Sequence, residues 1–478
     1  MKKIELQQTE SCCVSPSIKQ EINIQPKAES NNLPVAIIGA GPIGLAAAAN
    51  LVERGEKFII LESGSHVGNN ISEWGHVRLF SPWQYNMDKA SARLLSRHGW
   101  NAPTPDELPT GQELIEKYLL PLANLPEIKS QLNLNTKVIA ISRKDTDKMK
   151  SDLRESKPFI IYTETKGRMQ HYEAKAVIDA SGTWGNSNPI YASGVWTNEE
   201  QSLSDHIYYG IPNIQGNDKS RYIGKSIAVV GGGHSAINTL LDLAQLKEND
   251  PAINIMWIMR KNRVEDAYGG ESNDQLEARG ELGSRIHQLV NSEQIQVITP
   301  FRIQRLSRTG GKLTISGENK EGSRDLQGID EIIVNAGSRP DFSFLRELRL
   351  SIDQATESTE TLSPLIDPNI HSCGTVRPHG ERELRHSEKD FYIVGMKSYG
   401  RAPTFLMATG YEQVRSVVAA LAGDWEAAEK VELELPETGV CSINNSKDQS
   451  ESPAEKQTSS SCCSVSNATT ASSTSCCG

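Results

Sequence analysis

Residues 35–62 read VAIIGAGPIGLAAAANLVERGEKFIILE, and this stretch decides how the chain begins to fold. An apolar run at residues 35–38 ends in a glycine-rich turn, and an alanine-rich helical pattern follows. A second apolar run, at residues 58–61, ends in Glu62. The pattern predicts a strand, a turn, a helix and a second, parallel strand, which is typical of an α/β fold.

The turn itself, residues 39–44, contains Gly39, Gly41, Pro42, Ile43 and Gly44. The first glycine allows a tight turn, the second lets a pyrophosphate approach the main chain, and the third lets the helix pack closely on the strand. The helix N-terminus adds N–H groups and partial positive charge. We therefore expect a dinucleotide site, although an ordinary strand–helix–strand unit with a glycine-rich turn is the alternative.

Glu62 narrows the choice of dinucleotide. A carboxylate at the end of the second strand can accept hydrogen bonds from an adenosine ribose. It would also repel a 2′-phosphate, so the first site suits FAD or NAD rather than NADPH.

A second glycine turn follows the apolar run at residues 227–230, with Gly231, Gly233, His234, Ser235 and Ala236 in a GxGxxA pattern. A helical pattern extends from there to about residue 246, and residues 253–259 form the next predicted strand. We expect His234 to be a helix-start residue of the nucleotide site rather than a catalyst.

This second strand ends in Arg260 and Lys261 instead of an acid. Cationic side chains at this position suit the 2′-phosphate of NADPH. A solvated strand end is the alternative for Arg260.

The composition excludes several classes of function. Fifty Lys and Arg against 60 Asp and Glu give a formal net charge of −10, and no stretch has the basic character that nucleic acid requires. No apolar run approaches the ~18 residues of a membrane span. The first residues, MKKIELQQTE, lack the hydrophobic region of a signal peptide. We expect a cytoplasmic protein without nucleic-acid or membrane partners, and the oligomeric state stays open.

The eight cysteines are unevenly placed, because six of them form three adjacent pairs near the two ends of the chain. Neighbouring Cα atoms lie ~3.8 Å apart, short of the usual ~4.4–6.8 Å of a disulfide. We expect free thiols, which are soft ligands for soft metals and metalloids. The predicted substrate ligands are Cys373, Cys441, Cys462, Cys463, Cys476 and Cys477; a buried inert cysteine is the alternative for Cys373, and functionless thiols are the alternative for the pairs. No residue is predicted as a resident metal ligand.

The strands predicted at residues 174–179 and 329–334 would carry the chain out of one domain and back. The expected organisation is a disordered arm at 1–32, a first domain at 33–221 and 336–425 with a second inserted at 222–335, and a flexible Ser/Thr/Cys-rich tail at 426–478.

Residues 33–423 resemble the two-dinucleotide-binding flavoproteins, on the strength of the two turns with Glu62 and Arg260. Within them, three stretches are similar to bacterial FAD- and NADPH-dependent monooxygenases of arsenic resistance: GIPNIQGNDKSRYIGKSIAVVGGGHSAINTLLDLA, LIDPNIHSCGTVRPHG and FYIVGMKSYGRAPTFLMATGYEQVRSVVAALAGD. The resemblance implies two Rossmann-like domains, FAD and NADPH as cofactors, and further cofactor contacts at Trp74, Val138 and Gly395.

The resemblance also implies oxidation by O₂ of a small trivalent arsenic species, in detoxification, with no catalytic residue identified. The sequence lacks several motifs of related flavoprotein families, and their absence affects the choice of reaction. CxxC is absent from the second domain and CxxxxC is absent after Gly44, which argues against disulfide-reductase chemistry. The FxGxxxHxxxW fingerprint of one monooxygenase class is absent too.

Four readings follow: a metalloid monooxygenase, an NADPH-dependent reductase of a soft metal or an oxyanion such as selenite, an N- or S-hydroxylating monooxygenase, and a non-catalytic sensor. Arg78, Trp83 and Arg401 are pocket candidates by position alone.

Overall fold

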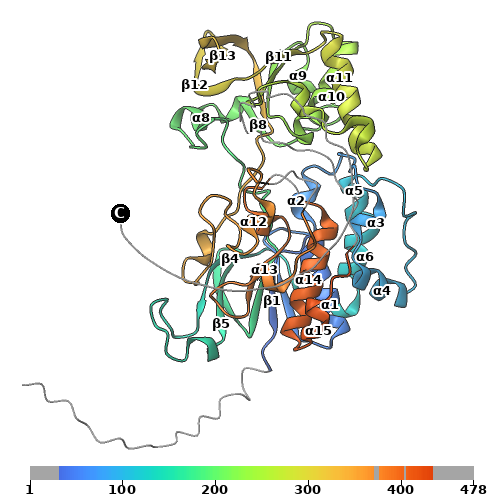
Figure 1. Ribbon diagram of the computed structural model, residues 1–478, viewed down its shortest axis with the longest axis vertical. Helices are drawn as coiled ribbons and strands as arrows, with labels where there is room; N and C mark the ends of the chain where they lie inside the picture. Colours follow the sequence, from blue (N-terminus) through green and yellow to red (C-terminus); the bar gives the residue numbers. More distant parts are fainter. Residues whose placement is uncertain (1–31, 371–375, 403–404, 434–478) are drawn as a thin grey trace, which may run out of the picture. The chain divides into compact units, whose positions relative to one another are not determined.

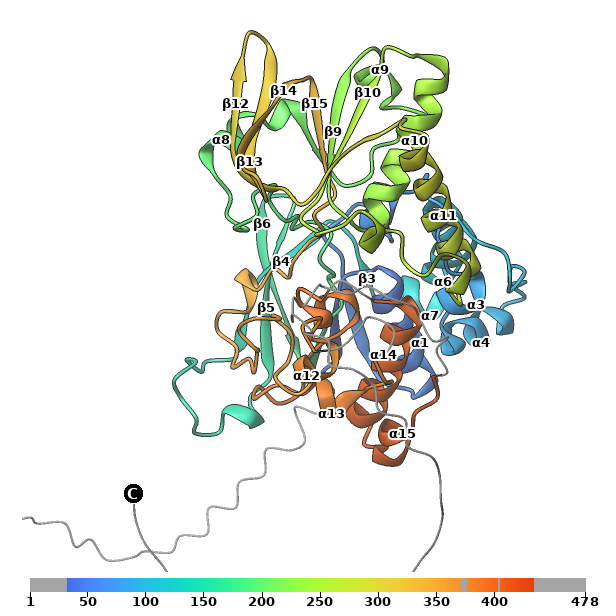
Figure 2. The same cartoon turned by 45° about the horizontal axis from the view of Figure 1, so that its top comes forward.

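The structure is a computed structural model that describes residues 32–370, 376–402 and 405–433. Figures 1 and 2 show the described chain as helices and strands built around two sheets. All eight cysteines lie outside these residues, and so do the predicted ligands among them, from Cys373 to Cys477.

The first sheet has five parallel strands in the order β16, β7, β1, β2, β3. Their bounds are Phe391–Ile393, Ala176–Asp179, Val35–Ile38, Phe58–Leu61 and Leu132–Asn133. Ile38 is level with both Leu61 and Asp179, so the central strands end at one edge. The chain order reverses at β1, where such sheets bind ligands.

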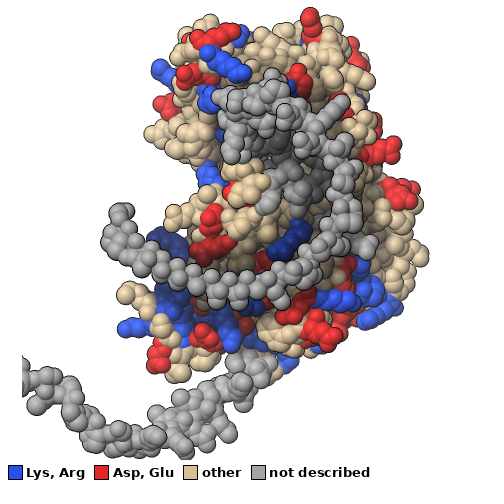
Figure 3. Space-filling view, viewed as in Figure 1, with Lys and Arg blue, Asp and Glu red and all other residues tan. Residues whose placement is uncertain are grey.

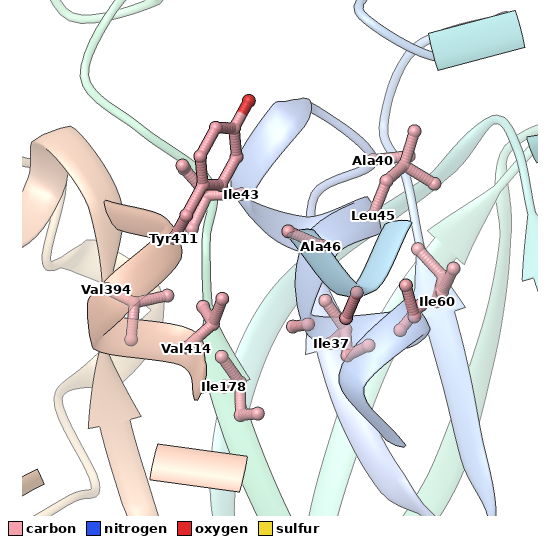
Figure 4. Packing of buried hydrophobic residues seen from close by; sticks show 14 of the residues in the cluster. Ile37, Ala40, Ile43, Leu45, Ala46, Ile60, Ile178, Val394, Tyr411 and Val414 are labelled. Carbon is pink, nitrogen blue, oxygen red and sulfur yellow. The ribbon is translucent and has the colours of Figure 1, made fainter. Parts of the chain in front are cut away.

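Helices cover one face of this sheet. α1 (Pro42–Glu53) is the glycine-turn helix, and α14 (Met407–Leu421) packs against it. A Cβ at Gly410 of α14 would lie only 2.6 Å from Cδ1 of Ile43; Figure 4 shows the apolar side chains that meet here. The alanines of α1 are fully buried, which lets the two helices approach closely.

A three-stranded antiparallel sheet covers the other face: β4 (Thr136–Arg143), β5 (Phe159–Thr165) and β6 (Arg168–Ala174). Its inward side chains, such as Ile141 and Ile161, share one apolar cluster with Ala36 and Ile38 of β1.

The second sheet repeats this plan in the order β11, β10, β9, β15, β8. The strands span Gln296–Ile298, Asn254–Ile258, Ser226–Val230, Glu331–Val334 and Ile207–Tyr209. Helices α10 (His234–Asn249) and α11 (Glu277–Asn291) cover one face. The antiparallel strands β12 (Arg302–Thr309), β13 (Lys312–Asn319) and β14 (Gly322–Ile329) cover the other, as Figure 2 shows.

Shorter helices connect these layers. They are α2 (Asn69–Ser72), α3 (Trp83–Asn86), α4 (Lys89–Arg97), α7 (Pro126–Lys129), α8 (Asn198–Ser202), α9 (Lys219–Tyr222), α12 (Ser363–Ile366), α13 (Glu381–Leu384) and α15 (Trp425–Glu429).

Several boundaries differ from the expectations. Residues 174–179 are two strands, because Ala174 ends β6 and the chain turns into the parallel sheet at Lys175, whose N–H donates to Pro34. Residues 329–334 divide in the same way at Asp330. The second sheet also recruits β8, which precedes the boundary expected at residue 222.

Residues 111–125, GQELIEKYLLPLANL, have a helical pattern that Pro121 interrupts, and the helix is interrupted in the structure. α5 (Gly111–Leu114) runs into a π-helical turn, Ile115–Leu119, before α6 (Leu120–Ala123). Pro121 lies in the first turn of α6, where its missing N–H costs least.

Acidic and basic side chains are interspersed over the described part of the face in Figure 3. Many are paired across elements, for example Arg93 of α4 with Glu53 of α1 at 2.7 Å. Among the described residues, no helix is both long and apolar enough to cross a membrane.

Candidate functional site

The first glycine turn has the geometry of a dinucleotide cradle. Gly39 has φ +97°, and a Cβ there would lie 2.8 Å from the Ala180 carbonyl oxygen. A Cβ at Gly44 would lie 2.0 Å from the carbonyl oxygen of Gly39. A Cβ at Gly41, by contrast, would meet nothing within 4 Å. Glycine is thus required for packing at two positions and leaves open space at the third, where a pyrophosphate would approach.

Glu62 is buried at the end of β2, beside this turn. Its Oε2 accepts the Ala40 N–H at 2.6 Å, and its Oε1 accepts the Gly64 N–H at 2.6 Å. Oε1 also accepts from the Ser63 hydroxyl at 3.4 Å. The carboxylate therefore fixes the shape of the turn, and Oε2 keeps a lone pair for a ribose hydroxyl. The turn, the open position and this acceptor fit FAD.

The three further residues predicted to contact a cofactor, Gly395, Trp74 and Val138, have different surroundings. Gly395, at φ +69°, follows β16 and lies beside Ile43, which starts α1 with Pro42. Trp74 packs near Trp184, with ring centroids 6.2 Å apart. Val138 lies in β4 with its side chain in the core, so only its main chain is left for a nucleotide.

A buried polar network holds Gly395. Its N–H donates to Gln413 Oε1 at 2.7 Å, so the amide nitrogen of Gln413 donates to Ser398 Oγ and to His379 Nε2, each at 2.9 Å. His379 is therefore neutral, with its proton on Nδ1 facing the Arg377 carbonyl at 3.1 Å. Burial lowers the pKa of His379, in agreement with this tautomer.

A fully buried ion pair lies at the end of β7. Lys397 Nζ is 2.7 Å from Asp179 Oδ2, and both side chains are 0% exposed. Ser181 Oγ donates to Asp179 Oδ1 at 2.6 Å. The pair ties the chain after β16 to the chain after β7, at the edge where Gly39 and Gly395 lie.

The second glycine turn is built like the first. Gly231 has φ +142°, and a Cβ there would lie 2.3 Å from the Asn335 carbonyl oxygen. A Cβ at Gly233 would meet nothing within 4 Å, which again leaves the cradle open. Ala236 replaces the third glycine and is buried in α10, and Ser235 lies in its first turn. Neither α1 nor α10 has a side-chain cap in the described structure, so first-turn N–H groups are left for an anion.

Arg260 and Lys261 lie beside this turn. The stem of Lys261 passes over Gly232, with Cε 3.2 Å from a Cβ built there, and its Nζ donates to the Asp266 carbonyl at 2.5 Å. Arg260 is exposed at the end of β10. This geometry fits the 2′-phosphate of NADPH.

His234 opens α10 and packs against Phe80 from the first domain, with ring centroids 5.1 Å apart. Burial, together with the nearby cations Arg279 and Lys261, lowers the pKa of His234 to about 4, while Asp274 opposes this shift. The imidazole is thus neutral at physiological pH.

The pocket candidates chosen by position do not come together. Trp83 is 1% exposed in the core, where its indole packs among apolar residues. Arg401 is paired with Glu357 at 2.9 Å. Arg78 donates to the Leu108 carbonyl at 2.5 Å. None of the three lines the pocket between the chain after α2 and the chain after β8.

That pocket, here called the interdomain pocket, has a volume of about 520 Å³. Its lining residues are Ser72, Glu73, Gly75, His76, Thr110, Gln112, Asn213, Asn217 and Asp218. They come from the chain after α2, the start of α5 and the chain after β8. No local sequence pattern predicts this pocket, because residues 72–112 on one wall and residues 213–218 on the other are more than a hundred positions apart.

A family model described as "Pyridine nucleotide-disulphide oxidoreductase" matches residues 36–376. The ferredoxin–NADP reductase of Lactobacillus gasseri is 24% identical over 346 residues, which are 71% of this chain and 85% of that protein.

Two solved structures have a similar fold. The cadaverine monooxygenase of desferrioxamine biosynthesis from Erwinia amylovora, bound to FAD, has a TM-score of 0.58 at 14% identity and covers 86% of this chain and 99% of its own. The bacillithiol disulfide reductase of Staphylococcus aureus has a TM-score of 0.57 at 18% identity, with 82% and 98% covered. Because the family model matches well over half of the chain, including both glycine turns, this protein belongs to the pyridine nucleotide-disulphide oxidoreductase family.

Proposed function

We propose that the chain is a monooxygenase that uses FAD and NADPH to oxidise a small trivalent metalloid, such as arsenite or an organoarsenical, in cytoplasmic detoxification. The observation that carries this choice is the absence of cysteine from residues 14–372, which include both glycine turns. Neither domain therefore supplies the pair of thiols beside a flavin that disulfide chemistry requires. FAD and NADP(H) are the cofactors that the two turns fit.

The reaction balances without a protein nucleophile. As(OH)₃, NADPH, O₂ and H⁺ give AsO(OH)₃, NADP⁺ and H₂O. Bound flavin supplies the transfer of electrons from NADPH to O₂.

The chain binds and orients the cofactors. The open positions at Gly41 and Gly233 admit the two pyrophosphates, and Glu62 accepts from the ribose of FAD. Arg260 and Lys261 attract the 2′-phosphate of NADPH. His234, which is neutral, adds no charge at the N-terminus of α10, so the helix itself provides the positive potential there.

An N-hydroxylating monooxygenase is the second candidate, and the interdomain pocket favours it. Glu73 and Asp218 both line that pocket, and two carboxylates suit an ammonium substrate. The fold it shares with the cadaverine monooxygenase is compatible with this reading.

The cysteines near the C-terminus remain a proposal for substrate capture. Cys441, Cys462, Cys463, Cys476 and Cys477 lie outside the described residues, as does Cys373. A tethered thiol pair raises the local concentration of a soft substrate without lowering the chemical barrier. Truncation after Cys441 should therefore raise the apparent KM for the metalloid and leave kcat nearly unchanged. An unchanged KM with glutathione present would refute capture.

The decisive experiment is NADPH consumption, with and without O₂, in the presence of arsenite, methylarsenite, selenite, Hg(II) or cadaverine. Stimulation by arsenite or methylarsenite that requires O₂ is the expected result. Consumption without O₂ would identify a reductase, and stimulation by cadaverine alone would identify the second candidate. With thiols blocked, anaerobic reduction should take two electrons per FAD; an uptake of four would reveal a disulfide.

A further inference from the structure

The interdomain pocket lies where a third reactant could meet both cofactors. Its first wall follows α2, and α2 begins beside the FAD turn, because the Gly68 N–H donates to the Ala40 carbonyl at 3.0 Å. Glu73 in this wall accepts from Trp184 Nε1 at 2.7 Å, and Trp184 lies just after β7. The wall is thus attached twice to the edge of the first sheet that carries the flavin site.

The second wall comes from the other domain. Residues 213–218 follow β8, and β8 ends level with Val334 at the edge that carries Gly231. Asp218 Oδ2 accepts the Asn213 N–H at 2.7 Å, which closes this loop on itself. The pocket is therefore bounded by chain that leaves both nucleotide-binding edges.

The charged side chains that line the pocket are acceptors, whereas Ser72, Thr110, Asn213 and Asn217 can both donate and accept. Glu73 and Asp218 are carboxylates, and Gln112 uses its amide nitrogen on Glu116 at 2.7 Å, which leaves its oxygen as an acceptor. His76 Nε2 is buried without a partner among the described residues. Burial lowers the pKa of His76, a shift that the Pro212 carbonyl and Asp218 partly offset. A neutral imidazole accepts at one nitrogen, and the lining has no Lys or Arg.

We propose that the interdomain pocket is the substrate site, and that it takes a small polar hydrogen-bond donor without negative charge. The carboxylates of Glu73 and Asp218 accept from the donor and exclude anions. An uncharged metalloid hydroxide such as As(OH)₃ and an organic ammonium such as cadaverine share this chemistry. Selenite, an anion at neutral pH, does not. One part of this inference rests on the proposed function, namely that the molecule bound in the pocket is the one that the enzyme oxidises.

The test replaces the carboxylates of Glu73 and Asp218 with uncharged amides of nearly the same shape. Holoenzyme of the wild type and of the double variant Glu73→Gln/Asp218→Asn, each with its cysteines alkylated so that thiols cannot bind arsenite, is titrated by calorimetry with arsenite, cadaverine and selenite. The wild type should bind arsenite, cadaverine or both, and should not bind selenite. Loss of a charge-assisted contact should weaken cadaverine at least about tenfold and arsenite less, and selenite should bind the double variant better than the wild type.

The matched control is Glu321→Gln, an exposed acid in the turn between β13 and β14. Failure of the wild type to bind arsenite and cadaverine, or equal affinities in the wild type and the double variant, would overturn the proposal. Turnover is measured separately. Ligand binding without oxidation would refute the proposed function and keep the site. Oxidation with a KM that is insensitive to both substitutions would keep the proposed function and refute the site.

Discussion

The turn after β1 and the turn after β9 begin alike, with a glycine at positive φ whose Cβ would collide with the chain that follows the neighbouring strand. They diverge three residues into the helix. Gly44 leaves no room for a Cβ, whereas Ala236 carries one in the corresponding place. The first helix is therefore held closer to its turn than the second.

The strands that follow the two glycine-turn helices, β2 and β10, also end differently. Glu62 is buried and bonded to two main-chain N–H groups, whereas Arg260 is exposed. The acid of the first site is thus buried and held in place, whereas the cation Arg260 of the second site faces solvent. This difference suits a flavin that stays bound through turnover and a nicotinamide nucleotide that must exchange in every cycle.

Gly44→Ala should have the largest effect, because its Cβ would lie 2.0 Å from the Gly39 carbonyl oxygen. Overpacking costs about 1–3 kcal/mol in typical cores, and here it displaces the FAD turn itself. We expect purified protein with little flavin and a lower Tm, measured by absorbance and thermal unfolding. Gly41→Ala is the matched control, since its Cβ meets no atom: it should keep the Tm of the apoprotein. A Gly44→Ala variant with full flavin would remove the distinction between the turns.

Glu62→Arg should also lose flavin, because it removes a ribose acceptor and two charge-assisted hydrogen bonds worth about 1.5–3 kcal/mol each. The flavin-to-protein ratio and the dissociation constant for added FAD measure the loss. Glu62→Gln, which keeps one acceptor oxygen, should retain more flavin than the arginine variant. Equal retention by wild type and Glu62→Arg would contradict the FAD assignment.

Arg260→Ala should act on the second site alone. A charge-assisted contact to a phosphate contributes about 1.5–3 kcal/mol, so the preference for NADPH over NADH in kcat/KM should fall by about 10- to 150-fold. Flavin content should not change. Arg263→Ala is the control, because Arg263 is already paired with Asp266 at 3.2 Å. Equal use of both nucleotides by the wild type would refute the role of Arg260.

His234, in the place that Pro42 occupies at the first turn, should give the second domain a modest acid sensitivity. The unfolded chain binds the proton near pH 6.5, and the folded chain binds it only near pH 4. The folded state is therefore destabilised as pH falls through this interval, by about 1–3 kcal/mol. His234→Gln should flatten the dependence of the unfolding free energy on pH between 7 and 4. An unchanged slope would show that burial beside Phe80 and the cations Arg279 and Lys261 do not hold the imidazole neutral.

The sequence by itself determined the parts that are encoded locally. Both glycine turns, the strands that flank them, the acid at Glu62 and the cations at Arg260 and Lys261 lie within short segments whose apolar period and glycine spacing are legible in one dimension. The family follows from the same segments. The interruption at Pro121 was legible too, because a proline acts through its own missing N–H.

The tertiary structure decided what depends on distant partners. A single apolar stretch at residues 174–179 serves two sheets, and β8 joins a sheet that the sequence places after it. Trp83 is buried in the core, although its position in sequence favours a pocket. His76 and Asp218 line one pocket from 142 positions apart. Such pairings follow from which faces can be buried together, and burial is a property of the whole chain rather than of any window along it.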